Sequence, residues 1–141
     1  MTPAQPRPVL GDDTALATAE AAVARFAAEL QAGLDASDAE VYDRSFAADV
    51  LWGSPYGATL AGADELIAVH RRLMSAAAAP RSRFEIVAVL APSPDVVLAH
   101  IRRQALGGDG FSEMALYVLV ERGGRWWLAG AQNTPIGQPP P

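Results

Sequence analysis

The sequence contains neither cysteine nor lysine. The lack of cysteine excludes disulfide bonds, thiolate catalysis and cysteine-based zinc sites. Its positive side chains are eleven arginines, set against sixteen acidic residues, so the formal net charge is −5. No basic run exceeds two residues. This balance argues against nucleic acid or an anionic membrane surface as the main partner.

Long apolar runs are also missing. Nothing approaches the roughly 18 uninterrupted apolar residues of a membrane-spanning helix, and no charged leader precedes an apolar stretch of secretory length. We therefore expect a cytoplasmic protein without a membrane partner. Half of the 141 residues are hydrophobic, which is enough for a core or for a core with an internal ligand cavity.

The length is typical of one domain. Residues 1–11 hold three of the eleven prolines and show no apolar periodicity, so they are expected to form a flexible lead-in. The predicted domain covers residues 12–136, and a proline-rich tail covers 137–141.

The first half of the sequence has helical periodicity. From residue 14 onward large apolar residues share one helix face: Val23, Phe26, Leu30 and Leu34. The stretch 33–37 predicts a break, after which Ser37 and Glu40 fit a capping box for a second helix through about residue 47. A short strand is expected over 50–52. A third helix is expected after Gly62, ending at the alanine stretch 76–79 before Pro80.

The second half has the pattern of strands. Runs rich in Val, Ile, Tyr and Trp cover residues 83–90, 96–106, 111–122 and 125–133, and short turns separate them. Connections of this length make consecutive strands antiparallel. The predicted fold class is α+β, with three helices of the first half covering one face of a curved antiparallel or mixed sheet.

Three stretches carry a resemblance to a known family: "YDRSFAADVLWGSPYGATLAG", "ELIAVHRRL" and "GRWWLAGAQNTPI". Together with the element order they resemble the nuclear transport factor 2-like cone fold, which includes ketosteroid isomerase, scytalone dehydratase and the SnoaL-like polyketide cyclases. Within this group the stretches are most similar to the SgcJ/EcaC-type proteins of natural-product gene clusters. The resemblance spans about residues 15–136.

The resemblance implies a conical pocket between the sheet and the helices, and a homodimer joined through sheet faces. It implies enzymes that use a pocket carboxylate or histidine with Tyr, Trp or Asn hydrogen-bond donors, and no metal. The sequence has no flavin or nicotinamide fingerprint, so we expect no cofactor.

His70 is the first catalytic candidate. It shares an apolar helix face with Leu66, Ile67, Leu73 and Met74, so it is expected to point inward. An inward histidine suits a general base or acid because its ordinary pKa lies near neutral pH. The alternative is a core histidine satisfied by one hydrogen bond.

His100 lies on the opposite face of its strand from Val97, Ala99 and Ile101, the better core face. With Arg102 and Gln104 it forms a possible interface between subunits. Two histidines are too few for a convincing metal site, and they would form one with a carboxylate only if they converged. No metal is therefore expected.

The predicted ligand pocket combines aromatic and apolar residues: Trp52, Tyr56, Leu66, Met74, Tyr117 and Trp126. Trp126 and Trp127 must point to opposite faces, and the family pattern favours Trp126 for the cavity. On the strand 111–122 the purer apolar face holds Met114, Leu116, Val118 and Val120. Glu113 and Tyr117 then face a partner subunit, or a polar-lined pocket if the faces are reversed.

Gln132 and Asn133 complete the candidate site. An amide offers both a donor and an acceptor, so either residue could orient a carbonyl or enol oxygen. The function hypothesis is a cofactor-free isomerase or cyclase of a small hydrophobic, polyketide-like molecule, with His70, Gln132 and Asn133 as catalytic residues. The alternative is a non-catalytic binding or accessory subunit of a biosynthetic pathway, acting as a dimer.

Overall fold

The computed structural model describes residues 3–76, 81–107 and 110–137. Their elements, in chain order, are α1 (Asp13–Ala36), α2 (Ala39–Tyr42), β1 (Phe46–Gly53), β2 (Thr59–Ala61), α3 (Ala63–Ser75), β3 (Ser82–Ser93), β4 (Val96–Ala105), β5 (Ser112–Arg122) and β6 (Arg125–Ile136). Most of the alanine stretch where the third helix was expected to end, residues 77–79, and most of the expected tail, 138–141, lie outside the described residues.

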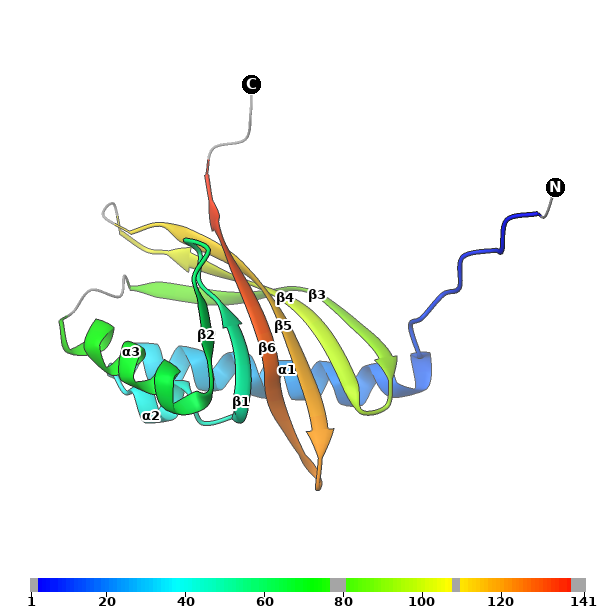
Figure 1. Ribbon diagram of the computed structural model, residues 1–141, viewed down its shortest axis with the longest axis horizontal. Helices are drawn as coiled ribbons and strands as arrows, with labels where there is room; N and C mark the ends of the chain where they lie inside the picture. Colours follow the sequence, from blue (N-terminus) through cyan, green and yellow to red (C-terminus); the bar gives the residue numbers. More distant parts are fainter. Residues whose placement is uncertain (1–2, 77–80, 108–109, 138–141) are drawn as a thin grey trace.

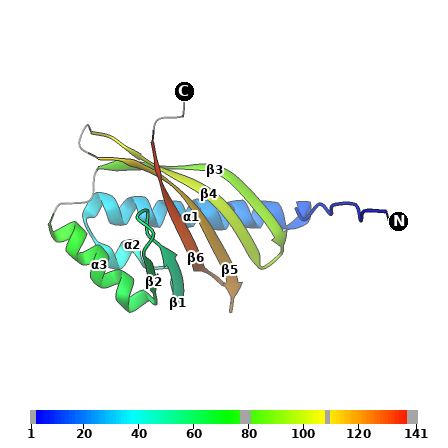
Figure 2. The same cartoon turned by 45° about the horizontal axis from the view of Figure 1, so that its top comes forward.

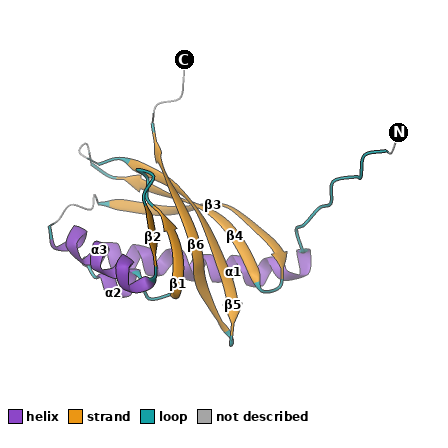
Figure 3. Cartoon of the chain, in the orientation of Figure 1, coloured by secondary structure: helices purple, strands orange, loops and turns teal. Residues whose placement is uncertain are grey.

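The strands form one sheet in the order β2-β1-β6-β5-β4-β3. β1 runs parallel to β6, and the other neighbouring pairs are antiparallel. The helices lie together on one side of this curved sheet: α1 passes beneath the strands, and α2 and α3 lie at the β1–β2 end (Figures 1 and 3). The turned view in Figure 2 shows the same two layers. The predicted α+β class with a mixed sheet is confirmed.

Two helix boundaries differ from the prediction. α1 continues past Gly33 to Ala36, and Ser37 then closes it in the left-handed conformation. The N-cap of α2 is Asp38, whose carboxylate accepts hydrogen bonds from the N–H groups of Glu40 and Val41. The predicted capping box on Ser37 is therefore wrong by one residue, because Ser37 is needed to end the preceding helix. α2 stops at Tyr42 instead of residue 47, and β1 begins at Phe46 instead of residue 50.

Gly33 is the point where α1 and α2 meet. A Cβ atom on this residue would lie 2.6 Å from the Cα of Tyr42 and 2.7 Å from its Cβ, so a side chain does not fit without moving the backbone. The absence of a side chain lets the two helices approach closely and fixes where Tyr42 and the next residue, Asp43, are held.

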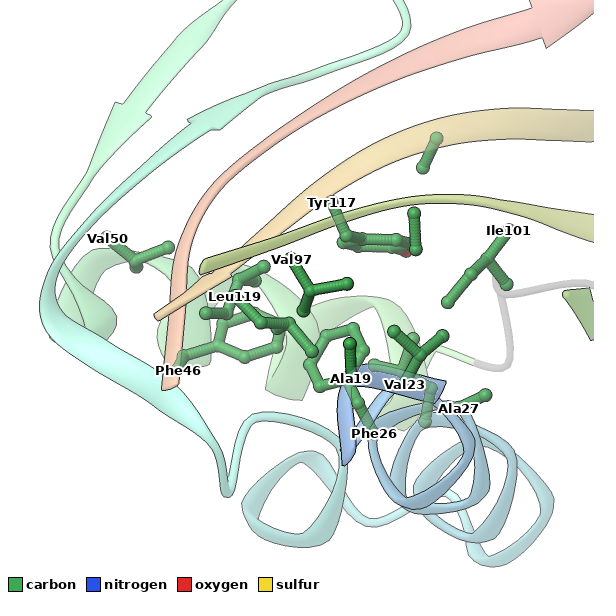
Figure 4. Close-up of a cluster of buried hydrophobic side chains, with 14 of the residues drawn as sticks. Ala19, Val23, Phe26, Ala27, Phe46, Val50, Val97, Ile101, Tyr117 and Leu119 are labelled. Atoms are coloured by element: carbon green, nitrogen blue, oxygen red, sulfur yellow. The ribbon is translucent and has the colours of Figure 1, made fainter. Parts of the chain in front are cut away.

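The core lies between α1 and the sheet. Figure 4 shows Val23 and Phe26 of α1 facing Val97, Tyr117 and Leu119 of the central strands, and Leu30 and Leu128 are fully buried in the same cluster. Burial of this contiguous apolar surface is the main stabilising term for such a layer packing.

The strand register decides which residues face the helices. On β4, Val97, Ala99 and Ile101 are buried and His100 is exposed, as the alternation predicts. Ala99 pairs with Tyr117 of β5, so Tyr117 shares the inner face, and Glu113 shares it by the same parity. Of the two interpretations for this strand, the one with Glu113 and Tyr117 towards the pocket is correct.

The outer edge of the sheet, β3, is partly covered by α1. The side chain of Gln31 donates from Nε2 to the Ser82 carbonyl at 3.0 Å, and its Oε1 accepts from the N–H of Phe84 at 2.8 Å. At the other end, the Asp12 N–H donates to the Ala91 carbonyl. Occupying edge groups in this way limits pairing with a further strand. Among the described residues no helix has the length and apolar character that a membrane span needs.

Candidate active site

An open cavity of about 450 Å³ lies between the inner face of the sheet and helices α2 and α3. Apolar and aromatic side chains make up most of its wall, including Trp52 of β1, Met74 of α3 and Phe84 of β3. Its rim includes Tyr56, which is 80% exposed, and Phe111, whose ring centroid lies 5.9 Å from that of Tyr56. The size and apolar character suit a small organic ligand.

His70 enters this cavity from α3. The helix begins after Gly62 and buries Leu66 and His70, which are four residues apart and share one face. His70 is only 9% exposed and lies among aromatic rings: its ring centroid is 4.9 Å from that of Tyr42 and 5.6 Å from that of Trp52. The histidine is therefore largely shielded from water while it lines the cavity.

Asp43 fixes the orientation of the His70 ring. Its Oδ1 accepts a hydrogen bond from Nδ1 of His70 at 2.7 Å, and both side chains are buried. A neutral imidazole that donates from Nδ1 carries its lone pair on Nε2, and a nearby carboxylate stabilises the imidazolium that forms on protonation. Nε2 makes no hydrogen bond to any residue the structure describes. The pair therefore has the geometry of a general base.

A second polar group lies on the sheet side of the cavity. Arg103 donates to Glu113 at 2.5 Å, to the Ser82 hydroxyl at 2.7 Å and to the Phe111 carbonyl at 3.0 Å. Both side chains of the ion pair are largely buried. A buried arginine paired in this way has its charge neutralised and most of its donors occupied.

Asn133 lies on the cavity wall where β6 meets β1. Its amide Nδ2 donates to the Gly53 carbonyl at 2.9 Å, which holds the side chain across the parallel pair. Its Oδ1 remains as an acceptor at the cavity.

The cavity brings together six of the residues predicted from sequence: His70, Asn133, Trp52, Tyr56, Met74 and Tyr117. Three others lie elsewhere. Leu66 is fully buried in the core, one turn before His70. Trp126 faces the helices at the far end of the sheet, beside Phe26 and Ser45.

Gln132 is the third predicted residue that lies outside the cavity. It pairs with Leu116 on the outer face of the sheet, and its Nε2 donates to the Asn133 carbonyl at 3.1 Å. A bulge in β6 is the physical reason: Leu128 pairs with Leu119, but Gly130 pairs with Val118, so Ala129 is an extra residue. The bulge shifts the alternation and turns Asn133 inward and Gln132 outward.

The predicted interface residues lie on that outer face. His100 is exposed and pairs with Leu116, Arg102 pairs with Met114 and lies 3.7 Å from Glu85, and Gln104 is exposed. His70 and His100 are thus on opposite sides of the sheet. Within the described parts of the chain there is no group of three or more His, Asp or Glu residues that could hold a metal ion.

Sequence reasoning missed two polar residues of the cavity wall, Tyr42 and Arg103, and it also missed Asp43, which pairs with His70. Tyr42 is the last residue of α2 and Asp43 is its C-cap, and this four-residue helix is too short to show a periodic face. The one available signal for Arg103 was its place in the alternation after Val97, Ala99 and Ile101.

The two tyrosines of the cavity interior have strongly perturbed acidity. Burial raises the pKa of Tyr42 well above its ordinary value, and Glu113 raises it further while Arg103 lowers it. Burial likewise raises the pKa of Tyr117, with smaller contributions from Tyr42 and Glu113 in the same direction and from Arg103 in the other. Both phenols therefore stay protonated at neutral pH and act as hydrogen-bond donors.

This acidity predicts a loss of stability in alkali. A phenol in the unfolded chain ionises near pH 10, while the folded protein keeps its proton, so the stabilisation present below about pH 10 is lost as the pH rises. The expected slope is about 1.4 kcal/mol per pH unit for each of the two tyrosines. Urea unfolding between about pH 9 and pH 11.5 measures it.

The chain is well suited to this measurement because it has no lysine and no cysteine to titrate in the same range. Tyr117→Phe should halve the slope. A free energy of unfolding that stays constant across this range in the unsubstituted protein would contradict the burial of both phenols.

Comparison with known proteins gives the family context of this site. The family model described as "SnoaL-like domain" matches residues 17–129. The comparison with curated proteins gave no match.

Solved structures show the same fold. A domain of unknown function with a cystatin-like fold from Nostoc punctiforme has a TM-score of 0.77 and 18% identity, over 86% of this chain and 79% of that one. A ketosteroid isomerase-like protein from Erwinia carotovora atroseptica has a TM-score of 0.70 and 19% identity, over 90% of this chain and 100% of its own. A nuclear transport factor 2-like protein of unknown function from Shewanella oneidensis has a TM-score of 0.71 and 12% identity, over 82% of this chain and 98% of that one.

Proposed function

This chain belongs to the SnoaL-like domain family, and on that premise we propose that it binds a small hydrophobic molecule in its cavity and isomerises or cyclises it by proton transfer, without a cofactor. The hydrogen-bonded Asp43–His70 pair is the observation that carries the proposal. The fold alone would not support a specific reaction, because folds of this kind host many unrelated functions.

The proton transfer follows from the geometry of the pair. Nε2 of His70 takes a proton from a carbon next to a carbonyl group of the ligand, and Asp43 stabilises the resulting imidazolium. The same imidazolium returns the proton to another carbon. In a cyclisation the carbanion instead adds to a second carbonyl within the molecule, and the alkoxide oxygen that forms takes the proton back from the imidazolium. Either outcome balances without a further reactant. The low exposure of His70 supports this role because water competes less for the proton.

The substrate class in this proposal is polyketide-like. It rests on the similarity of the three sequence stretches to SgcJ/EcaC-type proteins and on the apolar wall of the cavity, which suits planar or polyene molecules.

Proton exchange at a model ketone tests the proposal without the natural substrate. A naphthyl methyl ketone has acidic protons only on its methyl group, so a general base in the cavity should accelerate their replacement by deuterium in heavy water. Mass spectrometry follows the exchange. Binding of the ketone without accelerated exchange would refute catalysis and favour the accessory-subunit alternative, while absence of binding would refute the ligand-binding function itself.

We also propose a homodimer joined through the outer face of the sheet. The support is the row of apolar residues there, in which Leu98 pairs with Val118 and Leu116 is 37% exposed between His100 and Gln132. Sedimentation at micromolar concentration should give twice the mass of one chain, and Leu116→Asp should give a single chain. A monomeric unsubstituted protein would contradict the dimer.

A further inference from the structure

Residues 3–10 form an arm that lies outside the folded domain. All of them are exposed, and the exposed fraction reaches 93% for Val9 and 59% for Leu10, although both are large apolar residues. None of the eight makes a hydrogen bond or an ion pair to another described residue. Figures 1 and 2 show the arm extending away from the domain beyond the N-terminal end of α1. Its apolar side chains are therefore available to another molecule.

The base of the arm is fixed to the domain. The N–H of Asp12 donates to the Ala91 carbonyl at 2.8 Å, and the carboxylate of Asp12 accepts from the N–H of Thr14 at the start of α1. The chain thus leaves the domain at one defined point, beside the end of β3. From there eight residues of extended chain reach about 25 Å, at roughly 3.1 Å per residue. This length is enough to cross onto the surface of a second molecule.

The sequence of the arm favours a polyproline II helix. Prolines occupy positions 3, 6 and 8, and the rings of Pro6 and Pro8 keep the residues before them out of the α-helical region. A polyproline II helix has three residues per turn, so Pro3, Pro6 and Val9 share one edge. The arm therefore presents an apolar edge whose backbone is already restricted, which lowers the entropy lost when it docks.

A groove of matching chemistry lies on the outer face of the sheet. It is open, has a volume of about 690 Å³, and has in its wall Trp127 of β6 and the residue that pairs with it, Val120 of β5. The groove exists because β1 separates from β6 at this point, where residues 47–50 lie opposite the single residue Ala129. We call it the Trp127 groove.

Trp127 supplies this groove with a flat apolar ring and a free donor. Its indole N–H makes no hydrogen bond to any residue that the structure describes. The guanidinium of Arg125 lies over the ring, 4.1 Å from its centroid, and holds it in place. A polyproline II segment has no internal hydrogen bonds, so its carbonyl groups are acceptors without partners. Aromatic-lined grooves are the usual binding sites of such segments.

The charges of the arm and the groove are complementary in one orientation. Arg7 is the charged residue of the arm, and Asp49 lines the groove on the β1 side. Asp49 is exposed and forms no ion pair within the described part of the chain. Arg122 lines the groove on the β5 side, two strands away. Attraction to Asp49 and repulsion from Arg122 therefore place Arg7 on the β1 side.

We propose that residues 3–10 of one chain bind as a polyproline II segment in the Trp127 groove of a second copy. The apolar edge of the arm faces Trp127, and Arg7 pairs with Asp49. This inference is independent of the proposed reaction. It adds a contact to the proposed homodimer, because the groove lies on the same outer face, and two-fold symmetry lets each arm bind the other chain. A second copy is favoured over the chain's own groove because the arm extends away from its own domain (Figures 1 and 2).

A fluorescent label on the arm tests the docking in the full chain. The sequence has no cysteine, so Ala4→Cys gives one site for a bimane label, next to the docking edge. Contact with tryptophan quenches bimane. The labelled chain also carries Trp127→Phe, so its own groove cannot quench the label. Excess unlabelled protein should lower the fluorescence, and excess unlabelled Trp127→Phe protein should not. Thermal unfolding checks that each variant is folded.

Further substitutions assign the contact to its residues. Val9→Ser removes an apolar group from the docking edge and should raise the concentration at half-maximal quenching about fivefold or more. Gln5→Ser is the matched control, because residue 5 lies on another edge of the helix, and it should leave this concentration unchanged. Arg7→Glu should raise it about three- to tenfold at low salt. A partner chain with Asp49→Arg should then restore it.

Each contrary outcome overturns a defined part of the inference. If no partner chain lowers the fluorescence, the arm does not bind a second copy. If Trp127→Phe protein quenches as well as the unsubstituted protein, the arm binds outside the groove. If a labelled chain that keeps its own Trp127 is quenched and excess Trp127→Phe protein does not relieve it, the arm binds its own chain.

Sedimentation at the same concentration separates this inference from the proposed homodimer. Twice the mass of one chain without quenching overturns the arm contact and leaves the dimer. The mass of one chain without quenching contradicts both. Neither result affects the proposed ligand-binding function, which the ketone experiment tests by itself.

Discussion

Gly33→Ala should lower the free energy of unfolding by about 3 kcal/mol. An exposed helical glycine would respond in the opposite way, because alanine favours the helix by roughly 0.5–1 kcal/mol. At this position the new methyl group would lie 2.6 Å from the Cα of Tyr42, and its nearest neighbours include backbone atoms that cannot rotate away. The α1–α2 contact must therefore open. Urea unfolding monitored by tryptophan fluorescence measures the loss.

The effect should extend to the site. Tyr42 is the residue that Gly33 contacts, and Asp43 is the next residue in the chain. Opening the contact between the helices therefore displaces both the phenol of Tyr42 and the carboxylate of the Asp43–His70 pair. Gly107→Ala is the control: a Cβ there meets no atom within 4 Å, and the change should stay within about 0.5 kcal/mol. A Gly33→Ala protein that is as stable as the unsubstituted chain would show that the two helices are not packed this closely.

The sequence predicted the class of fold because two different periodicities follow each other along the chain. The period of the first half is helical, and that of the second half alternates, with turns too short for crossovers between its four strands. The parallel pairing of β1 with β6 could not be predicted, because it joins segments about 80 residues apart and leaves no local signal in the sequence.

The candidate site could be predicted in part, and the errors have local causes. His70 was found because a histidine on an apolar helix face is visible in sequence. Gln132 and Asn133 are neighbours in a strand and so must point to opposite faces, yet their order depends on the bulge at Ala129. Trp126 does face the helices, but the direction of a side chain does not tell which end of the sheet it occupies.

Asp43 shows a different limit. Its contact with His70 spans 27 residues and depends on three things at once: the αL residue Ser37 that ends α1, the Asp38 cap that starts α2, and the close approach at Gly33. Each of these could be read from sequence only after the helix boundaries were known to within one residue, which periodicity does not provide.

His70→Ala should reduce the deuterium exchange of the bound naphthyl methyl ketone by about 10²- to 10⁴-fold, the usual contribution of a positioned general base. Asp43→Asn should reduce it by up to about 10⁴-fold, because an amide does not stabilise the imidazolium and its NH2 group can hold the ring in the tautomer protonated on Nε2, which has no lone pair for the substrate. The rate per subunit is measured at saturating ketone, so that a change in binding does not enter.

Matched controls distinguish a base from a residue that merely supports the wall. His100→Ala removes the other histidine, which lies exposed on the opposite face of the sheet, and should leave exchange unchanged. Added imidazole should restore part of the exchange in His70→Ala, since the truncated side chain leaves room for it beside Asp43. A His70→Ala protein that binds the ketone normally and exchanges its protons at the original rate would remove the histidine from the mechanism. If His70→Ala instead loses ketone binding, and imidazole restores neither binding nor exchange, the residue would have a packing role in the aromatic cluster of Tyr42 and Trp52.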